Sequence, residues 1–212
     1  MTNIILIRHG YSLGNKEKKF TGQLDLPLDA VGFVQADSIR DYILKEYKVD
    51  KIFSSDLQRA YDTVKPLADA LQLDVVTSKA LREFDVGLWS GVAIEEVKNK
   101  FPAEFEVYKN TPGMFRFPNG ENYEEIQKRA VEFITGIAEE NKEKTIVVGT
   151  HGGVIRVLRA LWTDTPLSEI QKIAHVPNAS VTITEYENGK FSLKEVGITD
   201  HLSEKVSEEE IR

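Results

Sequence analysis

The sequence predicts an α/β protein, a three-layer α/β/α sandwich around a mainly parallel central sheet. Two largely apolar, β-branched runs, at residues 4–7 and 145–149, are typical of strands that are buried on both faces. Segments with apolar residues at helical spacing lie between these runs and after the second. Strands that alternate with helices form parallel sheets covered by helices on both sides, so both runs are assigned to such a sheet.

Shorter strand patterns complete the expected sheet. Residues 51–54 and 74–77 are each expected to form a short strand. Near the end of the chain, apolar positions alternate through residues 181–193 on both sides of the pair Asn188-Gly189. An Asn-Gly pair favours the tight turn of a two-residue β-hairpin, so a hairpin is expected there.

The helix patterns each show one apolar face that must be buried. Asp56 precedes the first pattern and can cap that helix with its side chain. The expected helices are residues 57–71, 126–138 and 154–162.

One region interrupts this alternation. Residues 86–120 are less periodic and carry three prolines and several aromatic side chains, which indicates a cap-like insertion over one end of the sheet. We expect residues 1–202 to form a single domain that includes this insertion. Residues 203–212 are rich in glutamate, and because chain ends are often mobile we expect an acidic, mobile tail there.

The composition narrows the classes of protein. The 212 residues are 41% apolar, enough for one substantial hydrophobic core. The net charge of -7 disfavours nucleic acid and anionic lipid as partners, so a bound anion needs a local cluster of donors. Without cysteine there are no disulfides, no thiolate catalysis and no zinc-thiolate sites. The sequence shows no leader and no stretch of about 18 apolar residues, so we expect a cytoplasmic protein without a membrane span. A homo-oligomer is possible, but the sequence does not determine the oligomeric state.

Both of the apolar runs end in a histidine. His9 follows the first run and His151 follows the second, where Gly152 and Gly153 lead directly into an expected helix. Ligands of parallel sheets bind beyond the carboxyl ends of the strands. The N–H groups at the start of a helix attract anions, so these histidines are expected to flank an anion site.

Other side chains suit a phosphoryl group. Arg8 offers a planar fork of donors, Asn15 offers an uncharged amide, and Arg59 lies at the start of an expected helix. Glu83 and Asp85 are candidate carboxylates for proton transfer. Structural alternatives stay open: a turn or cap role for Asn15, a surface ion pair for Arg59, and a purely structural role for Asp85.

Five short motifs carry these residues. They are Leu6-Ile7-Arg8-His9-Gly10 with Ser12 and Asn15, Phe20-Thr21-Gly22, Ser54-Ser55-Asp56-Leu57-Gln58-Arg59-Ala60, Glu83 with Gly87 and Gly91, and Thr150-His151-Gly152-Gly153. In order and spacing they resemble the histidine phosphatase superfamily, which has the phosphoglycerate-mutase-like fold. The resemblance covers roughly residues 3–200.

The resemblance implies a reaction mechanism. His9 would be the nucleophile that forms a phosphohistidine, and Glu83 would protonate the leaving group and then activate water. An imidazole with an ordinary pKa of about 6.5 is largely unprotonated at neutral pH and can attack without a base. Its ring would be held in one tautomer by a backbone carbonyl.

The resemblance also implies which residues hold the substrate, a small phosphorylated molecule. Those expected around the phosphoryl oxygens are Arg8, Asn15, Arg59 and His151, and those expected to complete the pocket are Thr21, Gly22 and Gly152. The cationic groups would offset the charge of the transferring phosphoryl, so neither a metal ion nor another cofactor is expected.

Alternatives to a phosphatase remain. A cofactor-dependent phosphoglycerate mutase is the main one, but after Glu83 this chain lacks the mutase stretch Tyr-Gly-x-Leu-x-Gly-Leu-Asn-Lys and has Glu95 and Glu96 near the place of its lysine. The pattern Glu-Phe-Asp-Val-Gly-x-Trp-x-Gly instead looks like the phosphatase-type members. A metallohydrolase that uses His9, His151 and carboxylates lacks the usual ligand spacings. A non-catalytic protein that binds a phospho-ligand is the remaining alternative.

Overall fold

The computed structural model describes residues 1–203, which are built around a six-stranded sheet with the strand order β3-β2-β4-β1-β5-β6. The strands are β1 (Thr2–Arg8), β2 (Lys51–Ser55), β3 (Val75–Ser78), β4 (Thr145–Thr150), β5 (Val181–Glu187) and β6 (Lys190–Ile198). Strands β1 to β4 are parallel to one another, whereas β5 is antiparallel to β1 and to β6. The prediction of a mainly parallel sheet is therefore confirmed. Apart from residue 203, the expected acidic tail lies outside the described residues.

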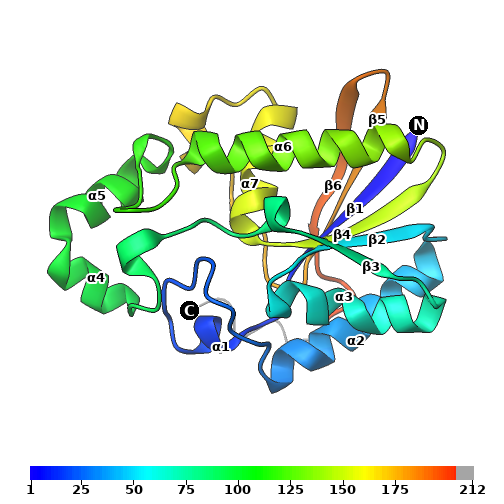
Figure 1. Cartoon of the computed structure of the whole chain (residues 1–212), viewed down its shortest axis with the longest axis horizontal. Helices are drawn as coiled ribbons and strands as arrows, with labels where there is room; N and C mark the ends of the chain where they lie inside the picture. Colours follow the sequence, from blue (N-terminus) through cyan, green and yellow to red (C-terminus); the bar gives the residue numbers. More distant parts are fainter. Residues whose placement is uncertain (204–212) are drawn as a thin grey trace.

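Helices cover both faces of the sheet, as the sequence predicts (Figure 1). The α-helices are α1 (Leu13–Lys16), α2 (Ala30–Glu46), α3 (Gln58–Leu71), α4 (Ile94–Lys100), α5 (Pro102–Asn110), α6 (Tyr123–Glu140) and α7 (Gly152–Trp162). Within residues 1–203, no helix is long and apolar enough to cross a lipid bilayer.

The central strand β1 joins the two halves of the core. Its four apolar side chains, Ile4 to Ile7, are all fully buried. Ile4 and Leu6 pack with residues of α6 and α7, whereas Ile5 and Ile7 pack with residues of α2 and α3. Because successive side chains of a strand point to opposite faces, this continuous apolar run is what a three-layer core requires.

Helix α2 was not anticipated from the sequence. Asp29 caps it by accepting hydrogen bonds from the N–H groups of Val31 and Gly32. Its buried residues include the polar Gln35 beside Ala36, Ile39 and Ile43. Phe33 and Val34, by contrast, are 48% and 54% exposed. These exposed apolar residues obscure the helical periodicity on which the sequence analysis depends.

The expected cap of α3 is wrong. The helix begins at Gln58, and the carboxylate of Asp56 is instead paired with the Arg82 guanidinium, at 2.7 and 2.6 Å. The N–H of Gln58 donates to Asp25 Oδ1 at 2.6 Å. A carboxylate more than thirty positions away in the chain thus takes the capping role, because the bidentate arginine pair has already engaged the local one.

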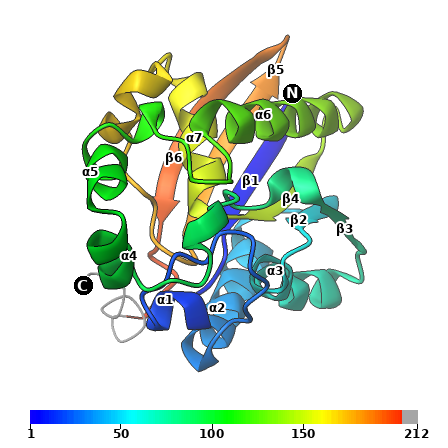
Figure 2. The same ribbon diagram turned by 60° about the vertical axis from the view of Figure 1, so that its left-hand side comes forward.

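Residues 86–120 surround an aromatic cluster. Trp89, in a short 3-10 turn, is fully buried and its ring contacts those of Phe20, Tyr108, Phe115 and Phe117. Helix α5 contributes Tyr108 to this cluster, and helices α4 and α5 lie at one side of the molecule, away from the centre of the sheet (Figure 2). The sequence analysis did not anticipate these two helices, because their few apolar positions serve ring packing and not a regular helical face.

The Asp25 cap makes a testable contribution to stability. We expect Asp25→Ala to lower the free energy of unfolding by about 0.5–2 kcal/mol, the usual cost of losing a helix cap. Urea denaturation of the purified variant measures this loss. As a control, Asp69→Ala removes an exposed ion pair with Lys65 in the same helix and should change stability by less than about 0.5 kcal/mol. Equal losses in the two variants would contradict the assignment of the cap.

Candidate active site

The parallel pairing of β1 with β4 brings the two motif histidines together. Arg8 and Thr150 are register partners at the ends of these strands, and the His9 N–H donates to the Thr150 carbonyl at 2.9 Å. The next residues, His9 and His151, are both buried, with ring centroids 5.2 Å apart. Two residues that are 142 positions apart in the sequence therefore share one site.

The His9 imidazole is held in a defined tautomer. Its Nδ1 lies 2.7 Å from the Gly10 carbonyl oxygen, so Nδ1 carries the proton and Nε2 has a free lone pair. Asn178, just before β5, donates to the carbonyl oxygens of His9 and Gly10 at 2.9 and 3.1 Å and fixes the same turn. Burial, followed by the charges of Arg59 and Arg8, lowers the pKa of His9 well below its usual value. Burial and these charges therefore favour the neutral ring.

The His151 ring is held by a third strand. Its Nε2 lies 2.9 Å from Oγ of Ser55, the last residue of β2, and that oxygen also accepts the Leu57 N–H at 3.3 Å. Burial and the nearby Arg59 charge lower the pKa of His151 well below its ordinary value. Its Nδ1 is buried and has no hydrogen-bond partner within residues 1–203. The site thus contains two neutral imidazoles.

The arginines are fixed by backbone carbonyls. Arg59 is 1% exposed and donates to the carbonyl oxygens of Gly22 and Leu24 at 2.7 and 2.8 Å. Burial lowers its pKa to about 10, so it remains charged at neutral pH. Arg8 donates to the Val176 carbonyl at 2.5 Å. A surface ion pair, the structural alternative for Arg59, is therefore wrong.

The Glu83 carboxylate lies at the first turn of α7. Its Oε2 accepts the Gly153 N–H at 3.1 Å, and its Oε1 accepts the Phe84 N–H at 3.0 Å. A Cβ at Gly153 would lie 2.1 Å from Oε1, so only glycine leaves room for this carboxylate. At Gly152 a Cβ would lie 3.2 Å from Arg8 Nε. The space left by the missing side chains of Gly152 and Gly153 is therefore occupied by Arg8 and Glu83.

The other residues expected in the pocket contact the protein itself. The Asn15 amide oxygen accepts the N–H and hydroxyl of Ser12 at 3.1 and 2.8 Å, in the capping box of α1, which leaves its NH₂ group to donate to a ligand. Thr21 Oγ1 fills the space where a Cβ of Gly14 would lie, only 2.1 Å from it. Gly22 has a φ of +52° and offers its carbonyl to Arg59. The capping role considered for Asn15 is thus present.

The carboxylate Asp85 and the other histidines have structural contacts. Asp85 Oδ1 accepts the Gly87 N–H at 2.9 Å and stabilises a turn. His175 pairs with Arg156 at 2.8 Å, and His201 contacts the Ala179 carbonyl at 2.9 Å. In the described part of the chain, no three or more histidine, aspartate or glutamate side chains gather in a way that could hold a metal ion. The ligand set of the metallohydrolase alternative is therefore not assembled there.

Comparison with known proteins gives the class that this fold and site define. The chain belongs to the histidine phosphatase superfamily (branch 1), whose family model matches residues 4–199. The resemblance stated from the motifs is thus confirmed.

Individual relatives point to phosphatases. Phosphoserine phosphatase 1 of Hydrogenobacter thermophilus is 30% identical over 204 residues, covering 96% of each chain. The metal-independent phosphoserine phosphatase of Arabidopsis thaliana is 28% identical over 205 residues, covering 96% of this chain and 84% of that one. The solved structure of Bacillus stearothermophilus YhfR has a TM-score of 0.90 at 27% identity and covers 95% of this chain and 99% of that one. The chain is therefore a phosphatase-like enzyme of this superfamily.

Ser55 and Asn178 contact the two histidines but are not among the site residues predicted from the sequence. Ser55 is within a quoted motif, at the carboxyl end of an expected strand, and this position could have suggested a contact with the neighbouring strand end. Asn178 precedes β5, which is antiparallel to β1, so its arrival at His9 depends on a pairing that the local sequence does not encode.

The hydroxyl of Ser55 should affect activity more than that of its neighbour. We expect Ser55→Ala to lower kcat/KM for nitrophenyl phosphate by about 2–10-fold, since a hydrogen bond contributes about 0.5–1.5 kcal/mol. Ser54→Ala is the matched control: this adjacent hydroxyl is also buried but has no hydrogen-bond partner in the described residues. If both variants lose the same activity, repacking of β2, and not the bond to His151, explains the loss.

Proposed function

We propose that the protein is a metal-independent phosphomonoester hydrolase that works through a phosphohistidine on His9. The observation that carries this proposal is the state of the His9 ring: its Nδ1 is engaged by Gly10, its pKa is lowered, and the charges of Arg59 and Arg8 act on it. A neutral imidazole beside fixed cations can attack phosphorus without a base, while the cations stabilise the charge of the transition state.

The reaction then proceeds in two balanced steps. His9 Nε2 attacks phosphorus, the N–P bond forms, and the ester P–O bond breaks as Glu83 gives its proton to the leaving oxygen. In the second step Glu83 takes a proton from water, the water oxygen attacks phosphorus, and the N–P bond breaks. Inorganic phosphate leaves and His9 returns to its neutral state. The position of Glu83 at the first turn of α7, next to His151, supports this role.

Residues 1–202 act as one catalytic domain in this proposal. Arg8, Asn15, Arg59 and His151 bind the phosphoryl oxygens, with Thr21, Gly22 and Gly152 supporting the pocket. Residues 86–120 cover the site and select the rest of the substrate. Because two relatives are phosphoserine phosphatases, phosphoserine is the first monoester to test.

The mutase alternative is less well supported. A mutase must hold a second anionic group of its intermediate, which requires cations beyond those at the phosphoryl site. Glu95 and Glu96, near the place of the mutase lysine, belong to α4, where they pair with Lys98 and Lys100. The charges of these lysines are thus largely offset within the helix. We therefore favour a phosphatase over a mutase.

The proposal is tested by phosphate release from a panel of small monoesters that includes phosphoserine. We expect release at pH 6–7.5 in the presence of EDTA, and none from His9→Ala, with label from the substrate found on His9 after rapid quenching. Efficient interconversion of phosphoglycerates with little released phosphate would favour the mutase instead. Binding of monoesters without any release would favour a non-catalytic protein.

Glu83→Gln separates the proton-transfer role from substrate binding. We expect this variant to lose about 10²–10⁴-fold of kcat/KM on alkyl phosphates, the usual contribution of a general acid. The loss on nitrophenyl phosphate should be much smaller, because nitrophenolate leaves without protonation. Steady-state kinetics on the two substrates measures both losses. Equal losses would remove the acid role from Glu83.

A further inference from the structure

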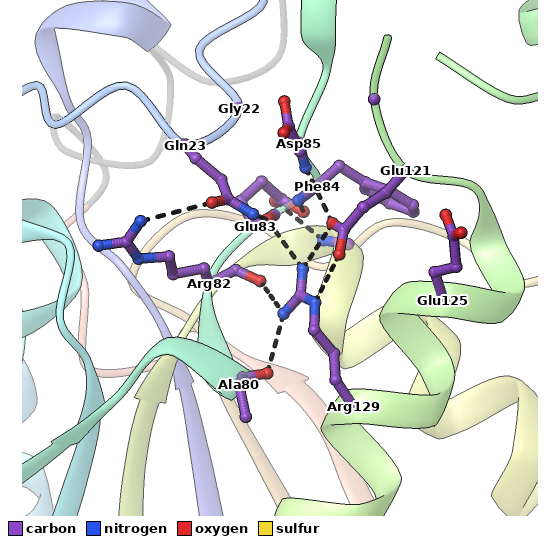
Figure 3. A network of polar contacts seen from close by, with 12 residues as sticks. Gly22, Gln23, Ala80, Arg82, Glu83, Phe84, Asp85, Glu121, Glu125 and Arg129 are labelled. Atoms are coloured by element: carbon purple, nitrogen blue, oxygen red, sulfur yellow. Dashed lines mark hydrogen bonds and ion pairs between the residues drawn. The ribbon is translucent and has the colours of Figure 1, made fainter.

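A half-buried guanidinium outside the proposed phosphoryl pocket holds the segment that carries Glu83. Arg129, on α6, donates to the carbonyl oxygens of Ala80, Arg82 and Glu83 at 2.8, 2.6 and 3.0 Å (Figure 3). Neither the motif analysis nor the proposed reaction assigns it a role. Because residues 79–85 connect β3 to the site without a long helix or strand of their own, these bonds substitute for regular secondary structure.

Glu121 completes the same arrangement from the other side. Its carboxylate pairs with Arg129 through two bonds of 2.8 Å, and its Oε2 also accepts the Asp85 N–H at 2.9 Å. Its own N–H donates to the Asp85 carbonyl at 2.8 Å. The Arg129 and Glu121 side chains are each only 21% exposed. The backbone is therefore fixed both at Glu83 itself and two residues after it.

The charges are arranged so that Arg129 does not pair with the carboxylate of Glu83. Its charge is opposed by Glu121, and it reaches Glu83 through the main-chain carbonyl. The Glu83 carboxylate accepts backbone N–H groups of Phe84 and Gly153 instead. Arg129 therefore acts on the main chain of Glu83 and not on its carboxylate.

We propose that Arg129 and Glu121 are positioning residues that hold the main chain around Glu83, so that its carboxyl group points at the leaving oxygen. This inference rests on the proposed function of Glu83. It gives Arg129 its main effect on the proton transfers of Glu83, although the Arg129 charge is also among those that lower the pKa of His151.

The test compares Arg129→Met with a matched arginine. Arg40→Met is the control, because Arg40, on α2, also pairs with carboxylates, those of Asp37 at 2.6 Å and Asp41 at 2.8 Å, and its side chain is 30% exposed, but it lies outside the proposed pocket and outside residues 86–120. We expect Arg129→Met to lose about 10–100-fold more kcat/KM on an alkyl phosphate than on nitrophenyl phosphate, within the range of general acid catalysis. Arg40→Met should show no such difference.

A double variant separates positioning from general damage to the fold. If Arg129 acts through Glu83, then Glu83→Gln with Arg129→Met should lose no more alkyl phosphatase activity than Glu83→Gln alone. Multiplied losses, or an equal loss of Arg129→Met on both substrates, would overturn the inference. If Arg129→Met does not fold, Glu121→Gln keeps the arginine and should show a smaller difference in the same direction; its absence would equally overturn the inference.

The outcomes also separate this inference from the function on which it rests. If Glu83→Gln shows the difference between substrates and the folded Arg129 or Glu121 variant does not, only the positioning role is wrong. If Glu83→Gln itself shows no difference, the acid role of Glu83 and the inference built on it both fail.

Discussion

The register between β1 and β4 is the constraint on which the site depends. Parallel pairing of Arg8 with Thr150 means that both strands end at the same level and that the residues after them meet. A shift of one residue would turn every side chain of β1 to the opposite face and would exchange the two halves of the core. The apolar side chains from Ile4 to Ile7, all fully buried, therefore fix the site as well as the fold. The pairing of β1 with β4 thus determines both the packing of the core and the proximity of His9 to His151.

The electrostatics of the site follow from burial. An imidazole removed from water loses its proton readily, and the neighbouring guanidiniums act in the same direction on His9 and His151. An arginine in the same surroundings stays charged, since even after burial the pKa of Arg59 is about 10. The same environment thus favours neutral rings at His9 and His151 and a charged guanidinium at Arg59. Carbonyl oxygens of Gly22 and Leu24 hold Arg59 in place without neutralising it.

The elements that are predicted correctly from the sequence are those encoded by neighbouring residues along the chain. The apolar runs of β1 and β4, the helix periodicity of α6 and α7 and the turn at Asn188-Gly189 are local, and each matches the structure. The motif histidines could be placed because parallel strands end at a common edge. Asp56 was assigned to the wrong helix cap, since its partner Arg82 lies 26 positions away. The contacts of Ser55 and Arg129 are likewise made across the chain, where spacing carries no signal.

The amino end of α7 contacts two of the residues expected in the site, His151 and Glu83. His151 is the N-cap residue of α7, and Gly153, in its first turn, donates its N–H to the Glu83 carboxylate. The His151 ring and the Glu83 carboxylate are therefore both attached to the first turn of α7, while the main chain of Glu83 is held by Arg129 of α6. A displacement of α7 relative to α6 would change the distance between the two groups. Glycine at position 153 leaves room for the Glu83 carboxylate at the first turn of α7. Any other amino acid there would push this carboxylate away from the helix.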